Sequence, residues 1–443
     1  MAPRVDPVSS DEALPSRTKI VIVGGGIIGA STALFLAQKG INSVVCEKGH
    51  IAGEQSSRNW GWCRKMGRDP RELPLIIESL RLWQGMNQMV EAETGFRQPG
   101  IAYLCETEEE LAVQEQWLEY ARPYQLDTRI IGGAEVARIM PGTAKQWAGA
   151  LHTPSDGKAE PQKAASAIAA AARRGGATIL TGCAVRGVET AAGRVAAVIT
   201  ERGRIACDSV VLAGGAWSRL FCGNLGLDLP QLKVLASVMR TEKVEGGPEC
   251  SGSGAGFGFR KRLDGGYNVS MLAPTIVDIV PDSFRLLRDF VPLAGVKRKE
   301  FRPRIGRRFV EEWRTPRCWR LDEASPFEKI RVLDPAPSDA TLDKAAANIA
   351  AVFPAFKGVP IAERWAGLID VTPDAVPVIA PVAALPGFFV ATGFSGHGFG
   401  IGPGAGRLMA DLVAGDTPLV DPAPFRFERF ADRSHPGPFA LAT

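Results

Sequence analysis

A glycine-rich turn near the N-terminus has the residue types and spacing needed to bind a phosphate-bearing dinucleotide. Gly24, Gly26 and Gly29 form a G-x-G-x-x-G pattern between the apolar residues 20–23 and the helix-type residues 30–39. The first glycine permits a tight bend, the second lets backbone amides approach a pyrophosphate, and the third lets helix and strand pack closely. The N–H groups at the start of the helix then face the phosphate charge. The pattern predicts a dinucleotide site, and we expect Ile28 to contact the same ligand.

An acidic residue follows this turn at the distance that such sites use. Glu47 ends a second predicted strand, residues 43–47, and is followed by Lys48. A carboxylate there can accept hydrogen bonds from ribose hydroxyls. The alternative is a glycine-rich turn in an unrelated α/β protein. The strand, helix, second strand and acid in register favour the dinucleotide site.

An arginine is the side chain best suited to bind a carboxylate, because its guanidinium donates two parallel hydrogen bonds. The run Leu-Asp-Gly-Gly at 263–266 predicts a tight hairpin turn, which would place Arg262 opposite Tyr267 and Arg260 opposite Val269. These four side chains would then share one face of the sheet. We expect Arg260 to bind the carboxylate beside Tyr267; the alternative is a solvated arginine on a basic strand.

Other candidates lie next to glycine turns. Arg64 is the second choice for the carboxylate, although a surface position is the favoured interpretation there. Trp62, Phe394 and Trp365 are expected to wall a pocket, with plain core packing as the alternative. His397, inside the turn 393–402, either orients a ligand or makes structural hydrogen bonds.

The elements around these residues predict an α/β fold. Strand-to-glycine turns recur at 209–215 and 387–402, far from the first one, so one sheet must be built from discontinuous pieces. Residues 232–330 instead alternate in polarity and contain proline breaks, which is typical of antiparallel strands. We therefore predict a discontinuous Rossmann-like dinucleotide domain with a second, mainly antiparallel β-sheet substrate domain of α+β type.

Composition argues against a nucleic-acid-binding, membrane-spanning, secreted or metal-binding protein. The 443 residues carry a net charge of 52 − 48 = +4. This is far from the strongly basic charge expected of a nucleic-acid-binding protein. No run of about 18 apolar residues predicts a membrane helix, and residues 1–17 lack the apolar core of a signal peptide, so we expect a cytoplasmic protein without a stable membrane anchor. Eight scattered cysteines and four histidines predict reduced thiols and no metal site.

Three segments resemble the D-amino-acid-oxidase-like FAD superfamily, which contains glycine and sarcosine oxidases. They are the N-terminal glycine turn, the run Val-Leu-Ala-Gly-Gly-Ala-Trp at 211–217 and the run Ala-Thr-Gly-Phe-Ser-Gly-His-Gly at 391–398, after Thr-Pro-Asp. The resemblance implies an FAD domain in several chain segments and an antiparallel substrate domain. We accordingly expect an FAD domain of residues 18–70, 145–232 and 360–430, a substrate domain of 71–144 and 233–359, and flexible tails at 1–17 and 431–443.

Six blocks are similar to the bacterial L-amino acid deaminase and L-amino acid oxidase branch. They lie at 47–58, 183–190, 213–221, 319–328, 353–357 and 421–425. Two departures leave the side-chain preference and the electron acceptor open. The pocket glutamine of those deaminases falls at Trp62, and Gly400 stands where sarcosine oxidases often have a lysine that helps oxygen react.

The resemblance also implies the residue roles. Ser56, Ser57 and Arg58 would hold the pyrophosphate, and the backbone of Val185 would meet the adenine. The set expected to bind FAD is Gly24, Gly26, Ile28, Gly29, Glu47, Lys48, Ser56, Ser57, Arg58, Val185, Gly214, Gly215, Trp217, Gly398, Phe399, Gly400 and Ile401. The set expected to act on the substrate is Arg260, Tyr267, Trp62, Phe394 and His397.

The expected function is FAD-dependent oxidative deamination of L-α-amino acids to 2-oxo acids and ammonia. Dioxygen is the expected acceptor, with another acceptor as the alternative, and the aromatic residues predict a broad preference for apolar side chains. An oxidase or dehydrogenase of a D-amino acid or a secondary amine is the first alternative, because fold does not fix substrate. A flavoprotein subunit of an electron-transfer complex is the second. A homo-oligomer is left open.

Overall fold

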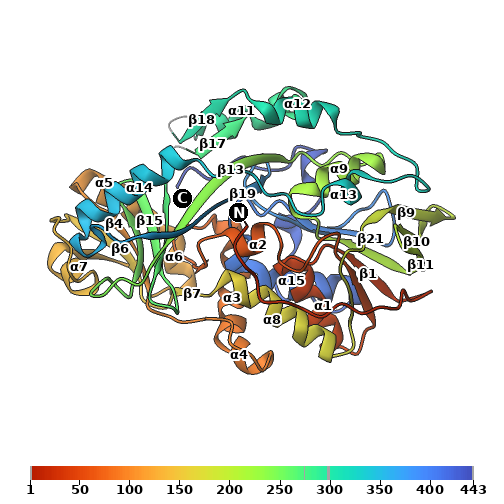
Figure 1. Ribbon diagram of the computed structural model, residues 1–443, viewed down its shortest axis with the longest axis horizontal. Coiled ribbons are helices and arrows are strands. Elements are labelled where there is room, and N and C mark those ends of the chain that lie inside the picture. Colours follow the sequence, from red (N-terminus) through yellow and green to blue (C-terminus); the bar gives the residue numbers. More distant parts are fainter. Residues whose placement is uncertain (1, 274, 297–299, 442–443) are drawn as a thin grey trace.

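A six-stranded sheet forms the core of one half of the protein, and five of its strands run parallel (Figure 1). The computed structural model describes residues 2–273, 275–296 and 300–441. β1 (Ile20–Val23) lies in the middle, with Ile20 and Ile22 packed on one side of the sheet and Val21 on the other. A parallel strand covered on both faces needs such a continuous apolar run. The strand order is β20 (Val378–Pro381), β21 (Phe388–Thr392), β12 (Ser209–Leu212), β1, β2 (Ser43–Cys46) and β8 (Thr178–Leu180).

Helices cover one face of this sheet and a small antiparallel sheet covers the other. α1 (Ile27–Gln38) packs between α8 (Pro161–Arg174) and α15 (Gly398–Ala414), and α3 (Leu73–Gln84) packs on α15. Residues 27–36 of α1 are all buried, so its N-terminus is held inside the protein. The small sheet consists of β9 (Val185–Ala191), β10 (Arg194–Thr200) and β11 (Gly203–Ala206).

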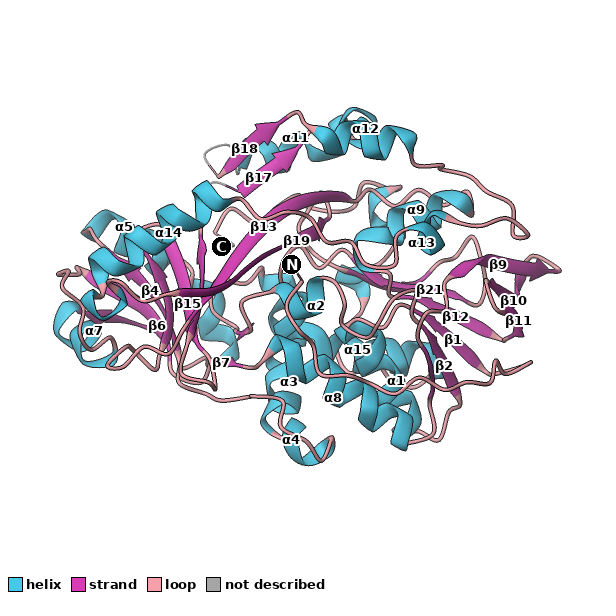
Figure 2. Cartoon of the chain, viewed as in Figure 1, coloured by secondary structure: helices cyan, strands magenta, loops and turns pink. Residues whose placement is uncertain are grey.

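A ten-stranded, mainly antiparallel sheet fills the other half, and α14 (Asp339–Val352) lies across it (Figure 2). Its longest strands, β13 (Leu232–Thr241) and β19 (Ile361–Val371), pair along their whole length. Its other strands are β4 (Ile101–Cys105), β5 (Arg129–Gly132), β6 (Gly149–Thr153), β14 (Ser251–Gly254), β15 (Phe257–Lys261), β16 (Tyr267–Met271), β17 (Thr275–Asp278) and β18 (Phe301–Arg304).

The remaining helices have ten residues or fewer, and a two-stranded ribbon completes the structure. The helices are α2 (Gln55–Arg58), α4 (Met86–Met89), α5 (Glu108–Gln116), α6 (Leu118–Ala121), α7 (Gly133–Ile139), α9 (Ser218–Asn224), α10 (Pro281–Arg285), α11 (Leu287–Val296), α12 (Arg307–Arg314) and α13 (Pro326–Lys329). β3 (Trp62–Cys63) pairs with β7 (Gly157–Lys158). In the described part of the chain no helix has both the length and the apolar character that a bilayer crossing requires.

The predicted fold class is confirmed, but several segments lie in the other half from the one expected. β6 and β19 join the large sheet, although residues 145–232 and 360–430 were assigned to the FAD domain. α3 packs on α15, although residues 71–144 were assigned to the substrate domain. Periodicity identifies a strand or helix, whereas its partner depends on long-range contacts that the local pattern does not encode.

The described parts of both tails pack on the body of the protein, contrary to the expectation of flexible ends. Near the N-terminus, the Asp11 carboxylate pairs with Arg173 of α8 at 2.6 Å. Near the C-terminus, the ring of Phe439 meets that of Tyr120 edge-to-face at 5.0 Å. Residues 1, 442 and 443 lie outside the described residues.

Candidate active site

A cavity of ≈ 890 Å³ extends from the glycine turn to the large sheet. This volume is at the upper end of the range of small-molecule sites, about 300–1,000 Å³. Its walls include the predicted segments around Gly24, Gly214 and Gly398, and on the far side residues 234–238 of β13. Pro438 and Phe439 of the C-terminal segment also line it. The two sheets therefore enclose one elongated site.

The glycine turn leaves room for an anion in front of α1. Gly24 has φ +109°, and a Cβ there would lie 2.4 Å from the Ala213 carbonyl oxygen. At Gly26 the same construction meets only the Ser56 hydroxyl, at 3.0 Å. Ser56 Oγ in turn accepts a hydrogen bond from the Ile27 N–H at 2.9 Å. A side chain at Gly24 would collide with the Ala213 backbone. A side chain at Gly26 would instead fill the space in front of α1 that an anion would occupy.

Glu47 lies beside this turn with part of its carboxylate unused. Its two oxygens accept the N–H groups of Gly25 and Gly49, both at 2.7 Å. Burial raises the pKa of Glu47. An ionised carboxylate has about four lone-pair sites, so two remain for hydroxyl donors from the cavity.

Most of the predicted cofactor residues line the cavity, and three do not. Those that do are Gly24, Gly26, Ile28, Glu47, Lys48, Ser56, Arg58, Val185, Gly214, Gly215, Trp217, Gly398, Phe399 and Gly400. Gly29, Ser57 and Ile401 lie behind its wall; a Cβ at Gly29 would approach the Gly24 carbonyl oxygen to 2.1 Å. Gly29 therefore serves the packing of the turn.

Two of the predicted cation contacts are already engaged by the protein. Arg58 donates to Gly53 O, to the Asp334 carboxylate at 2.6 Å and to the Ala366 carbonyl at 2.8 Å. Lys48 pairs with Glu54 at 2.6 Å and lies 4.6 Å from the Trp217 ring centroid. Both side chains fix the loops around the cavity, and their contact with pyrophosphate stays a prediction.

Two arginines line the far end of the cavity, next to aromatic rings. Arg64 and Arg68 are 7% and 2% exposed, and the Arg64 guanidinium lies 5.6 Å from the Tyr103 ring centroid. The Tyr103 ring lies 6.3 Å from that of Trp62. Arg68 donates to the carbonyl oxygens of Arg64 and His397, and its other terminal nitrogen, NH1, has no hydrogen-bond acceptor in the described part of the chain.

His397 and a buried glutamate stand beside this arginine pair. His397 Nδ1 lies 3.1 Å from Glu72 Oε2, and Arg68 lies 3.8 Å from the same oxygen. Burial, reinforced by the Arg68 charge, lowers the pKa of His397 to about 4. Burial and the neighbouring Arg64 likewise lower the pKa of Arg68 to about 10. Strongly shifted groups that meet in a cavity are typical of active sites.

Comparison with known proteins assigns the family. Residues 19–412 match the family model of FAD dependent oxidoreductases, DAO. The chain belongs to this family. It is similar to an L-amino acid deaminase from Proteus myxofaciens, solved in complex with anthranilate, with 37% identity, 97% of each chain covered and a TM-score of 0.94. The deaminase from Proteus vulgaris matches with 33% identity over 96% of this chain and 100% of that one, with a TM-score of 0.92.

More distant relatives of this DAO-family chain are amine and glycine oxidases. Glycine oxidase of Pseudomonas aeruginosa is 25% identical, with 92% of this chain and 98% of that protein covered. 4-Methylaminobutanoate oxidase of Paenarthrobacter nicotinovorans is also 25% identical, but this chain spans 47% of its length.

The cofactor of the DAO-family chain is FAD, and the cavity fits it. The glycine cradle at the start of α1 suits the pyrophosphate, and Glu47 suits a ribose. The start of α15, Gly398–Gly400, presents helix N–H groups to the cavity, where they suit a partly negative ring atom. FAD supplies two-electron oxidation of a bound substrate.

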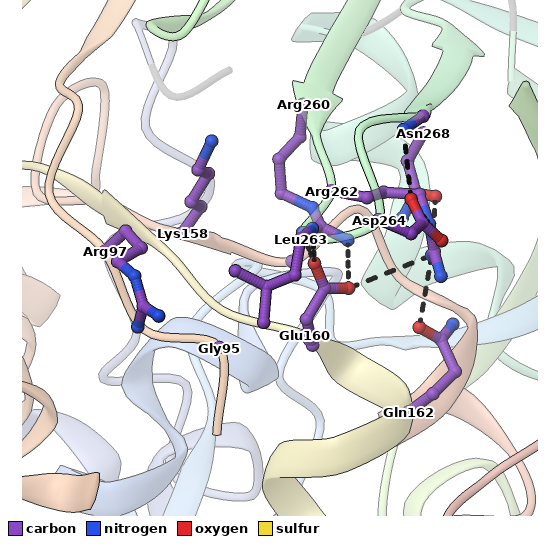
Figure 3. A network of polar contacts seen from close by, with 12 residues as sticks. Gly95, Arg97, Lys158, Glu160, Gln162, Arg260, Arg262, Leu263, Asp264 and Asn268 are labelled. Atoms are coloured by element: carbon purple, nitrogen blue, oxygen red, sulfur yellow. Dashed lines mark hydrogen bonds and ion pairs between the residues drawn. The ribbon is translucent and has the colours of Figure 1, made fainter. Parts of the chain in front are cut away.

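Arg260 does not line this cavity, and the protein itself uses its guanidinium (Figure 3). It is 0% exposed, and its two terminal nitrogens donate to the two oxygens of Glu160 at 2.8 and 3.0 Å. Its Nε donates to the Trp60 carbonyl at 2.5 Å. Tyr267 is also fully buried, and its hydroxyl donates to the Pro248 carbonyl at 3.0 Å. The contacts of these two residues are structural, which corrects the predicted pair.

The expected register of the hairpin is wrong by one residue. Arg262 N–H donates to Gly266 O at 2.8 Å, so Lys261 lies opposite Tyr267 and Arg260 lies opposite Asn268. A shift of one residue moves a side chain to the other face of a sheet. Arg260 and Tyr267 therefore point to opposite faces.

Three other residues predicted to act on the substrate do line the cavity. They are Trp62, Phe394 and His397, and Arg64 joins them, whereas Trp365 lies outside the lining. The sequence analysis missed Arg68 and Glu72. No periodic pattern marks them, because residues 64–69 form a loop and a turn between β3 and the short helical turn at Pro70–Glu72.

Proposed function

We propose that this chain catalyses the oxidative deamination of L-α-amino acids to 2-oxo acids and ammonia, with dioxygen as acceptor and hydrogen peroxide as co-product. The observation that carries the proposal is the pair of buried guanidiniums, Arg64 and Arg68, at the end of the cavity next to the turn before α15. Guanidinium groups beside a cavity are well suited to bind an anion. An α-carboxylate supplies two acceptor oxygens in the plane that guanidinium donors require.

The rest of this end of the cavity favours an apolar side chain. Leu104, Val238 and Met271 line the cavity from the large sheet, and Phe394 lines it from the turn before α15. An amino acid held by its carboxylate at the arginines would extend its side chain over these residues. A preference for leucine, methionine or phenylalanine over aspartate or glutamate follows.

The handedness of the substrate is supported by similarity. The L-amino acid deaminases from two Proteus species match nearly the whole chain at 37% and 33% identity. Oxidation of a secondary amine or glycine is the second candidate, because glycine oxidase and sarcosine dehydrogenase are relatives at 25% and 23% identity. Both candidates place a carboxylate on Arg64 and Arg68.

Anaerobic reduction of the bound flavin tests the proposal without depending on the acceptor. The purified holoenzyme is mixed with L-leucine, L-phenylalanine, their D-enantiomers, sarcosine and glycine, and bleaching of the flavin absorbance is followed. Rapid bleaching by the L-amino acids alone is expected. Faster bleaching by sarcosine or glycine would replace the proposal with the second candidate. Peroxide formed in air at one equivalent per 2-oxo acid would support dioxygen as acceptor; turnover that needs an artificial acceptor would overturn that part.

A further inference from the structure

The contact between His397 and Glu72 fixes which ring nitrogen of the histidine carries the proton. Glu72 is fully buried, and although burial raises its pKa, its contacts with His397 and then Arg68 hold that pKa below the usual value. An ionised carboxylate can only accept, so the hydrogen in the 3.1 Å contact must come from Nδ1 of His397. A neutral imidazole has one N–H. Nε2 therefore carries a lone pair.

This lone pair is directed to the cavity. His397 lines the cavity and keeps 13% of its side chain exposed, while Nδ1 is turned to the buried Glu72. Nε2 has no hydrogen-bond partner in the described part of the chain and is not among its buried, unpartnered polar atoms. It is an acceptor that the protein leaves unused.

The acceptor stands next to the arginines that would hold the carboxylate. Arg68 donates through Nε to Arg64 O at 3.2 Å and through NH2 to His397 O at 3.3 Å. The same arginine thus contacts the backbone of both residues. In an α-amino acid, one carbon separates the carboxylate from the amino group, so a carboxylate on this pair brings the amino group into the neighbourhood of the imidazole.

We propose that His397 Nε2 accepts a hydrogen bond from the α-amino group of the substrate, and that Glu72 is a positioning residue that keeps His397 in the required tautomer. The inference rests on the proposed function and deepens it. Carboxylate, amino group and side chain would then each have a separate partner, at the arginines, at His397 and on the large sheet. Three attachment points select one enantiomer, because the mirror image cannot place all three groups on these partners at once.

His397 acts here as a hydrogen-bond acceptor and not as a general base. Burial and the Arg68 charge hold its pKa at about 4, and Arg64 adds to this; Glu72 acts in the opposite direction. A base this weak does not remove an ammonium proton efficiently near neutral pH. Nε2 instead orients a substrate that binds with its amino group already in the neutral form.

Two ligands that differ only in a donor group test the inference. L-2-Hydroxy-4-methylpentanoate has an O–H at the position of the amine, whereas 4-methylpentanoate has none. Their dissociation constants are measured by the perturbation of the flavin absorbance in wild type, His397→Asn and His397→Gln. Asn can still donate to Glu72 but does not reach the Nε2 position, whereas the Gln side-chain oxygen can. His50→Asn, at an exposed loop position outside the cavity, is the matched control.

The wild type and the His50→Asn control should bind the hydroxy acid roughly tenfold tighter or more, as expected for one hydrogen bond in a buried site. His397→Asn should lose this preference while its affinity for 4-methylpentanoate changes less than about twofold, and His397→Gln should regain part of it. A preference that survives in His397→Asn would overturn the inference, as would no preference in the wild type. Equal weakening of both acids would show a merely structural role. Failure of every L-amino acid to reduce the wild-type flavin would instead overturn the proposed function, independently of this comparison.

Discussion

Two clusters of buried arginines differ in how fully the protein uses their hydrogen-bond donors. Arg260, between the two halves, gives both terminal nitrogens to Glu160 and its Nε to Trp60 O. Arg68, in the cavity, donates to two backbone carbonyls and lies 3.8 Å from Glu72, and its NH1 has no hydrogen-bond acceptor among the described residues. Burial alone therefore does not mark a functional arginine. What separates Arg68 from Arg260 is that Arg68 lines the cavity.

The electrostatics of the two clusters differ in the same sense. The Arg260 charge, opposing the effect of burial, lowers the pKa of Glu160 to about 2, which is typical of a well-matched ion pair. In the cavity, burial and a second guanidinium lower the pKa of Arg68 to about 10, since the charges there repel. The Arg260–Glu160 pair stabilises the fold. The repulsion between Arg64 and Arg68 would instead decrease when an anion binds to them.

The two clusters are connected through one short loop. Arg260 holds the carbonyl of Trp60, and Trp60 and Trp62, on either side of Gly61, line the cavity with rings 4.9 Å apart. Trp62 Nε1 donates back to the Phe259 carbonyl at 3.3 Å. Arg260 thus positions the cavity wall without touching the substrate.

The largest expected effect is on stability, from Arg260→Ala. Removing one partner of a buried ion pair leaves the other charge unpaired, which costs about 3–5 kcal/mol. The free energy of unfolding, measured by urea denaturation of the holoenzyme, should fall by that amount. Arg97→Ala, which breaks the exposed pair with Glu93, is the control and should cost less than about 1 kcal/mol. Similar losses in both variants would contradict the assignment of Arg260 to the fold.

The next effect is on substrate binding, from Arg64→Ala. Loss of a charge-assisted contact to the carboxylate should raise KM for L-leucine roughly hundredfold, which corresponds to about 2.7 kcal/mol. FAD content and the urea midpoint should stay close to those of the wild type, unlike in Arg260→Ala. The exposed Arg81→Ala variant serves as control. If KM stays within about threefold of the wild-type value, the carboxylate does not bind at this pair.

A smaller effect is expected at the connection, from Gly61→Ala. Gly61 has φ +89°, and a Cβ there would lie 2.4 Å from the Ala159 carbonyl oxygen and 2.8 Å from Arg260 Nε. The positive φ alone costs an alanine about 1–2 kcal/mol, so stability should fall by at least that much. KM should rise as well, because the loop carries Trp60 and Trp62 into the cavity. A change in stability without any change in KM would show that the two clusters are independent.

The smallest expected effect concerns pH: protonation of His397 should leave kcat/KM unchanged near neutral pH. Because its pKa is lowered from 6.5 to about 4, it stays neutral at pH 5–8, and kcat/KM should show no loss from its protonation there. Stability responds differently from activity. Below about pH 6.5 the unfolded chain binds a proton at His397 that the folded protein does not bind until about pH 4. The free energy of unfolding should therefore fall as pH falls from about 6.5 to about 4. Flavin-reduction rates measured across this range check the first statement. A loss of rate centred near pH 6.5 that disappears in His397→Asn would contradict it.

The sequence by itself determined the cofactor half of the site. The glycine turn, the helix after it and Glu47 lie within 30 consecutive residues, and each follows from local turn and strand chemistry. The segments around Gly214 and Gly398 were found in the same way, as strands that end in glycine. The structure places all of these along one cavity because parallel strands of one sheet present their carboxyl ends at the same edge.

Only the tertiary structure decided which arginine faces the cavity. Arg260 meets Glu160 across 100 residues of sequence, and His397 meets Glu72 across 325. A hairpin that closes at Arg262 and Gly266 turned Arg260 away from Tyr267, through a difference of one residue that the Asp-Gly pattern does not specify. Side-chain direction in a sheet has a period of two, so register decides function there, and register is set by the long-range packing of both faces.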